Sequence, residues 1–187
     1  MTTFEYLSVL VSIIIGLALT RLLSGAARLI QLRRRVRPHA ITLGWMAFLF
    51  LANIQIWWVA FERRGDSEWT FFAFLLYLMI PINAFLLSYL VLPELGDEDV
   101  VDLQANFDAG RPWFFGLLAS LPAISLIEEL VNDGGLPMDA DVASRLALIP
   151  IALLAAHVRS ARFHFWNMVL SLGFICSYVV GLFLTLR

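Results

Sequence analysis

Six long apolar stretches constrain this chain more than any other feature of its sequence. A helix that crosses a bilayer needs about 20 predominantly apolar residues, and six stretches of the 187-residue chain meet this requirement. They cover about residues 4–23, 40–61, 70–92, 113–131, 142–158 and 165–186. Turn and charge signals separate them, so we predict a single all-α transmembrane domain over residues 1–187. Its architecture is a polytopic membrane bundle of six transmembrane helices, the first continuing to about Leu32.

The composition agrees with a membrane protein and excludes several kinds of chemistry. Hydrophobic residues make up 60% of the chain and charged residues 15%, whereas soluble domains carry about 45–50% and about 25%. All 13 basic residues are arginine, which excludes a retinal Schiff base, a pyridoxal lysine and a Walker A lysine. The single cysteine, Cys176, excludes an intrachain disulfide and a Cys-based zinc site. The net charge of −2 argues against nucleic acid as a partner.

Arginines in the loops predict how the bundle is oriented. Loops that carry an excess of arginine face the cytoplasm, and the first and fifth loops carry Arg33, Arg34, Arg35, Arg37, Arg159 and Arg162. Arg63 and Arg64 in the second loop are a minority against this orientation. The N-terminus lacks the positively charged start of a signal peptide. We therefore expect both termini outside the cell (N-out, C-out) and the odd-numbered loops inside.

Tryptophans near the expected helix ends support this register, because amphipathic indoles settle at membrane interfaces. Trp57, Trp58 and Trp69 flank the second loop, on the outer side. At the cytoplasmic interface we expect Trp45, Trp113 and Trp166.

The third loop, residues 93–112, is acidic and cytoplasmic in this topology. From Glu94 to Arg111 it has six acidic residues and one arginine, a net charge of −5. Four of its residues recur at helical spacing, namely Val100, Leu103, Gln104 and Phe107. The spacing predicts a short acidic interfacial helix between helices 3 and 4. Because the anionic inner leaflet repels such a helix, it should pack against arginines of its own chain or of a partner protein.

Arginines at the end of the first helix are candidate contacts for lipid phosphate or another anion. Arg21 and Arg28 are seven residues apart and share a helix face with Ser24 and Gln31. At 1.5 Å per residue, Arg21 lies about 25 Å below the outer end of this helix, near the inner headgroups. The alternatives are a simple lipid anchor and a cytoplasmic pocket for an anion or headgroup. The full candidate set is Arg21, Arg28, Arg33, Arg34, Arg35 and Arg37.

Polar and helix-breaking residues near the centres of the helices are the second set of candidates. Proline removes a helical hydrogen bond and frees the carbonyl four residues earlier, which here are the carbonyls of Tyr77, Leu118 and Leu146. A polar cavity at the midplane, as in transporters, would satisfy them; ordinary helix packing with interhelical hydrogen bonds is the alternative. The candidate cavity residues are Asn53, Gln55, Pro81, Asn83, Ser120, Pro122, Pro150 and Ser177.

No signature of catalysis accompanies these features. The sequence has no HExxH, no GxSxG and no glycine-rich phosphate loop, so we expect no enzyme activity, no catalytic residue and no cofactor. Three histidines at the inner helix ends match no metal motif, and we expect no metal: His39, His157 and His164. An outer acidic patch could hold a cation or form a solvated rim: Glu128, Glu129, Asp133, Asp139 and Asp141.

Three segments carry a resemblance to known proteins: Phe4 to Leu10 followed by Gly16, Trp69-Thr70-Phe71, and Trp113 to Leu117. Together they resemble an abundant, functionally uncharacterised group of small six-helix bacterial inner-membrane proteins. The resemblance implies a bacterial inner membrane and this topology, and it implies no activity. From the residues we expect a binding or accessory module for a membrane lipid, a protein partner or a second copy of the chain. The alternative is a small channel or carrier with a polar midplane cavity.

Overall fold

A computed structural model describes residues 3–62, 70–94, 100–137 and 139–185, and within them it contains six helices and two short strands. The helices are α1 (Thr3–Gln31), α2 (Ala40–Glu62), α3 (Phe71–Leu90), α4 (Leu103–Asp133), α5 (Ala140–His157) and α6 (Ala161–Thr185). Each is long and apolar enough to cross a membrane. The all-α, six-helix membrane bundle expected from the sequence is thereby confirmed.

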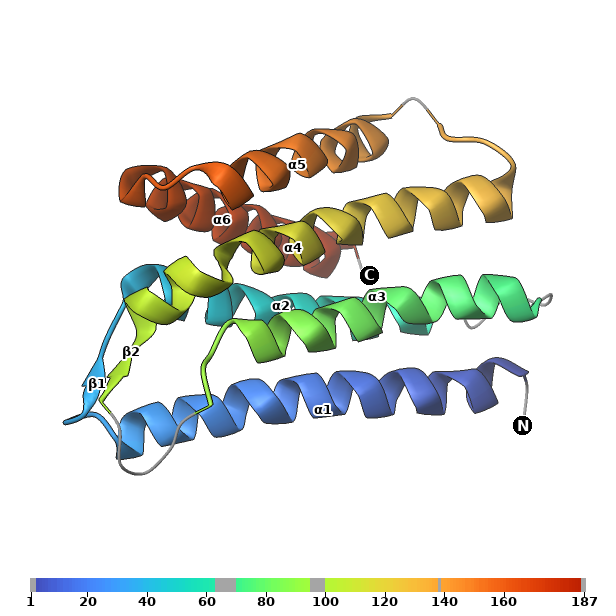
Figure 1. Ribbon diagram of the computed structural model, residues 1–187. Coiled ribbons are helices and arrows are strands. Elements are labelled where there is room, and N and C mark those ends of the chain that lie inside the picture. The colour runs from blue at the N-terminus through green and yellow to red at the C-terminus, as the bar shows by residue number, and fades with distance from the viewer. Residues whose placement is uncertain (1–2, 63–69, 95–99, 138, 186–187) are drawn as a thin grey trace.

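The helices form two layers. Figure 1 shows α1, α3, α4 and α5 side by side in this order, with α2 and α6 behind them. Within the front layer, α3 packs between α1 and α4, and α5 packs against α4. In the second layer, α2 packs against α1, α3 and α6. Although α5 and α6 are consecutive in the chain, α5 packs mainly against α4 and α6 packs mainly against α2.

One end of the bundle, called the arginine end below, gathers the arginine-bearing loops. It holds the turn after α1, the residues that follow α3, the start of α4 and the link between α5 and α6, all on the left in Figure 1. Strands β1 (Val36–Arg37) and β2 (Val101–Asp102) pair there in parallel. The alternation of helix direction thus places the first, third and fifth connections together, as the sequence predicts.

Helix α4 is longer than the sequence predicts. A separate interfacial helix was expected before a span at 113–131, whereas α4 is one continuous helix of 31 residues with Pro112 inside it. Asp102 caps its start, because its Oδ1 accepts hydrogen bonds of 3.0 Å from two backbone N–H groups of the first turn. The expected interfacial helix is therefore the first three turns of α4.

These first turns of α4 bury one face against the rest of the arginine end. Leu103, Phe107 and Arg111 are four residues apart, share a face and are buried. Val100 and Gln104, which the sequence-based interpretation places on the same face, are exposed. The difference arises because Val100 precedes the helix and Gln104 lies about a quarter-turn from the buried line.

An aromatic core lies beneath the arginine end. Trp45 in α2 is 0% exposed, and its ring is 5.4 Å from the rings of both Phe114 and Phe115 in α4. Neighbouring rings enclose Trp45 on the inside of the bundle, a burial that the sequence-based interpretation of an interfacial tryptophan does not foresee. Trp113 and Trp166 are exposed at this end, and their position at the membrane interface stays a prediction.

Candidate functional site

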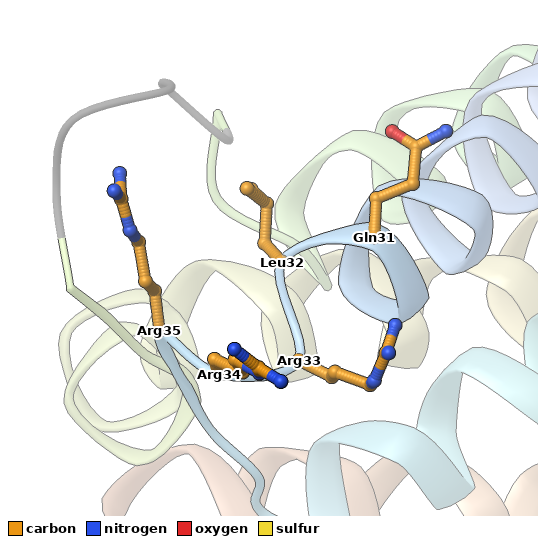
Figure 2. A pocket seen from close by; sticks show the side chains of 5 residues that line it. All are labelled: Gln31, Leu32, Arg33, Arg34 and Arg35. Atoms are coloured by element: carbon orange, nitrogen blue, oxygen red, sulfur yellow. The ribbon is translucent and has the colours of Figure 1, made fainter.

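The turn that follows α1 is the strongest candidate for a ligand site. Its backbone is closed by hydrogen bonds from the Leu32 N–H to the Arg28 carbonyl (2.8 Å) and from the Arg35 N–H to the Leu32 carbonyl (2.7 Å). An open pocket of about 230 Å³ lies here, lined by Gln31, Leu32, Arg33, Arg34 and Arg35 (Figure 2). Sites for drug-sized ligands are roughly 300–1,000 Å³. The arginine turn, defined as residues 31–35, therefore suits a small anionic group.

Two neighbouring arginines of this turn keep their charge unpaired within the described chain. Arg33 donates from Nη1 to the Ile30 carbonyl at 3.3 Å, which satisfies one carbonyl at the end of α1. Arg34 is exposed, as is Arg33. Among the residues that the structure describes, no carboxylate forms an ion pair with either guanidinium. An anion from outside the chain can pair with both.

A short ribbon ties the arginine turn to the start of α4. Val36 pairs with Val101 and Arg37 with Asp102, and the Val101 N–H donates to the Arg35 carbonyl at 3.0 Å. Arg37 Nη1 lies 3.5 Å from Asp102 Oδ2. A backbone N–H in the first turn of α4 holds the pKa of Asp102 below its usual value, so the carboxylate stays charged. At this point the acidic segment is neutralised by the chain's own arginine.

Arg21 lies apart from the arginine turn. Its Nη2 donates to the carbonyls of Leu92 (3.0 Å) and Pro93 (3.1 Å), directly after α3, and its Cζ is 4.9 Å from the centre of the Tyr89 ring. Positive charge is favourable at a helix C-terminus, so Arg21 fastens α1 to the end of α3. Of the predicted contacts, the structure therefore gathers Arg33, Arg34 and Arg35 in the turn. It places Arg28 in the last turn of α1 and Arg37 in the ribbon.

Sequence reasoning misses a second polar cluster, around the buried Arg111. This side chain donates from Nε to the Ala156 carbonyl at 3.4 Å, and its Nη1 lies 3.5 Å from Asp108 Oδ1. His164, also buried, places Nε2 at 2.8 Å from the Val158 carbonyl. Both side chains hold the end of α5 in place from neighbouring helices. The signal available in the sequence is the four-residue spacing that puts Arg111 on an apolar helix face.

His39 borders this cluster at the start of α2. Its Nδ1 is 2.9 Å from Thr42 Oγ1, and that hydroxyl donates to the Leu103 carbonyl at 3.3 Å. Burial lowers the pKa of His39, and the nearby carboxylates of Asp108 and Asp102 partly oppose this. Over the described part of the chain, no three His, Cys, Asp or Glu side chains are placed to hold a metal ion.

The candidate midplane residues form two separate pairs. Between α2 and α3, Asn53 donates from Nδ2 to the Leu49 carbonyl at 2.8 Å and to Ser88 Oγ at 3.5 Å. Between α3 and α4, Asn83 donates from Nδ2 to the Leu117 carbonyl at 3.2 Å and to the Ser120 hydroxyl. The bonds from Asn53 to Ser88 and from Asn83 to Leu117 and Ser120 are interhelical hydrogen bonds of the kind that ordinary packing uses. The bond from Asn53 to Leu49 lies within α2. Ser88 is the partner that the sequence did not single out.

The other candidate midplane residues do not join these pairs. Pro81 is buried and Pro122 half-buried, whereas Pro150 and Ser177 are exposed on the outside of the bundle. Asn53 Oδ1, Asn83 Oδ1 and Gln55 Nε2 are buried without a hydrogen-bond partner in the described chain. One pair lies between α2 and α3 and the other between α3 and α4, so the set does not converge on one point, and a solute path stays a prediction.

In the acidic patch at the opposite end of the bundle, an arginine of the same chain pairs with two of the carboxylates. Arg145 Nη2 lies 2.5 Å from Glu129 Oε2 and 2.6 Å from Asp141 Oδ2, and Nη1 donates to Ser125 Oγ at 3.1 Å. Asp139 caps α5 rather than facing this arginine. The patch is therefore in part an ion-pair network between α4 and α5, which are closely packed neighbours.

Comparisons with protein-family models, with curated proteins and with solved structures found no match for this chain.

Proposed function

We propose that this multi-pass membrane protein is a non-enzymatic binding module whose arginine turn holds the acidic headgroup of a membrane phospholipid. The observation that supports the proposal is the pair of exposed guanidinium groups, Arg33 and Arg34, without a carboxylate partner in the described chain. Guanidinium groups pair with phosphate through two parallel hydrogen bonds. The turn follows a membrane-spanning helix directly, which is the depth at which phospholipid headgroups lie.

The surface leading to the arginine turn suits acyl chains. Leu23 and Ile30 on α1 are 57% and 67% exposed, and they are seven residues apart on one face. Leu32 contributes an apolar wall to the pocket itself. A lipid whose chains lie along this face of α1 brings its phosphate to the guanidinium groups without leaving the bilayer. A lipid is therefore a better ligand for this site than a soluble anion.

Within the described part of the acidic segment, Asp102 pairs with Arg37 and Asp108 with Arg111. These two carboxylates are compensated by the chain's own arginines, whereas Arg33 and Arg34 have no carboxylate partner there, so we base the proposal on the arginines and not on a protein docked through the acidic segment. We further propose that the arginine end faces the cytoplasm and that the protein resides in a bacterial inner membrane. Support for the first comes from the arginine distribution, and for the second from the resemblance of three segments to a bacterial group.

The first prediction concerns lipid retention by the arginine turn. In nanodiscs that contain acidic and neutral phospholipid, native mass spectrometry should find acidic lipid retained on the protein after mild detergent treatment. The double variant Arg33→Gln/Arg34→Gln should retain about 30-fold less acidic lipid, since each arginine near a membrane surface contributes about 1 kcal/mol. The charge-matched control Arg159→Gln/Arg162→Gln removes two exposed arginines from the same end. Equal losses in both variants, or no enrichment of acidic lipid in the parent, would contradict the proposal.

A further inference from the structure

Arg33 and Arg34 are consecutive residues of one tight turn, and their charges add. Figure 2 shows the side chain of Arg35 extending away from those of Arg33 and Arg34. A guanidinium group stays protonated at any pH that a folded protein tolerates. Each of these two side chains therefore offers one positive charge that an external anion can neutralise.

The number of charges on the ligand decides how many of these two guanidinium groups it neutralises. A single phosphodiester carries one negative charge and can neutralise one of the two guanidinium groups. A headgroup with two negative charges neutralises both. When two phosphates belong to one molecule, binding of the first also places the second at a high effective concentration beside the second arginine.

We infer that the arginine turn selects phospholipids whose headgroup carries two negative charges over those that carry one. This inference rests on the proposed lipid-binding function and names its ligand class. The same charge chemistry exists in soluble pyrophosphate, but Leu32 in the pocket and the exposed Leu23 and Ile30 beside it offer contacts that only a lipid uses. Arg33 and Arg34 are then the residues that set the preference, and each should be necessary for it.

The test compares two acidic lipids at equal negative surface charge. Nanodiscs of neutral phosphatidylcholine receive either cardiolipin, with two phosphodiesters per molecule, or phosphatidylglycerol at twice the mole fraction, so that the surface charge is the same. Retained acidic lipid is then counted by native mass spectrometry. We expect about fivefold stronger retention of cardiolipin, the equivalent of one further arginine contact at about 1 kcal/mol.

Two single variants show whether the preference belongs to the turn. In Arg34→Gln, the ratio of retained cardiolipin to retained phosphatidylglycerol should fall from about five to about one, while phosphatidylglycerol is still retained. Arg162→Gln, an exposed arginine of the same end, should leave the preference unchanged. Equal retention of both lipids by the parent protein, or an unchanged preference in Arg34→Gln, would overturn the inference.

The outcomes separate this inference from the proposed function. If neither acidic lipid is enriched over phosphatidylcholine, the lipid-binding function itself fails. If both are enriched equally, that function stands and only the selection for two charges fails. A third arm adds pyrophosphate to protein in purely neutral nanodiscs. Binding of pyrophosphate as tight as that of cardiolipin would show that the ligand is a soluble anion and would overturn the assignment to lipid.

Discussion

Two arginines direct their charge at the ends of helices to which they do not belong. Arg21 of α1 bonds to the carbonyls of Leu92 and Pro93 after α3, and Arg111 of α4 bonds to the Ala156 carbonyl at the end of α5. The last carbonyls of a helix, such as that of Ala156, lack intrahelical partners and carry partial negative charge. Arg111 therefore acts as a cap supplied by a neighbouring helix, and Arg21 caps the chain segment two and three residues beyond α3.

Replacing Arg21 tests this role. Arg21→Ala should lower the free energy of unfolding by about 2 kcal/mol, because hydrogen bonds to charged groups contribute about 1.5–3 kcal/mol. Thermal unfolding in detergent micelles measures the change. The control Arg162→Ala removes an exposed arginine of α6 and should shift stability by less than about 0.5 kcal/mol. If both variants unfold like the parent, Arg21 is a lipid contact and not a cap.

Sequence reasoning singles out Arg21 but does not foresee its partners after α3. Its position in the helix follows from a rise of 1.5 Å per residue. Its acceptor carbonyls lie 71 and 72 residues away along the chain, and nothing local encodes that pairing. The consecutive arginines of the turn were found because they lie next to each other in the sequence.

At the scale of elements, the junction between α1 and α3 depends on a glycine. A Cβ atom added at Gly25 would collide with the side chain of Leu92, which is buried against α1. Gly25 lies one turn after Arg21, and both contact Leu92. The small residue thus permits the close approach that lets Arg21 reach the carbonyls after α3.

Two alanine substitutions in the same helix should have opposite effects. Gly25→Ala should destabilise the protein by about 1–2 kcal/mol, because overpacking a close contact costs about 1–3 kcal/mol. Gly16→Ala meets open space and should stabilise by about 0.5–1 kcal/mol through the higher helix propensity of alanine. Paired thermal unfolding measurements compare them. A stabilising Gly25→Ala would show that α1 and α3 do not approach this closely.

Helix α4 shows where element boundaries could not be predicted. The sequence-based interpretation placed a boundary between the loop at 93–112 and the span at 113–131, and Pro112 at that point is unfavourable inside a helix because it removes a hydrogen bond and clashes with the preceding turn. The structure continues through it, since Phe107 and Arg111 before the proline and Phe114 and Phe115 after it are all buried in one assembly. Tertiary packing on both sides of the proline outweighs its local cost.

At the scale of the whole molecule, the six spans were predictable and their neighbours were not. A run of about 20 apolar residues is sufficient to identify a spanning helix. The arrangement of α1, α3, α4 and α5 in a row with α2 and α6 behind them was not foreseen. Helices in lipid associate without a hydrophobic force between them, so small packing and polar contacts decide the order. The pairs Asn53–Ser88 and Asn83–Ser120 are such contacts.

Cysteine labelling in cells tests the central claim, a six-span bundle whose arginine end lies in the cytoplasm. In a Cys176→Ser background, Arg35→Cys marks the arginine turn and Gly135→Cys marks the exposed connection between α4 and α5. A membrane-impermeant maleimide should label Gly135→Cys in cells whose outer membrane is permeabilised and whose inner membrane is intact. It should label Arg35→Cys only after the inner membrane is also permeabilised. Labelling of Arg35→Cys before that step, or of both positions together, would contradict this account.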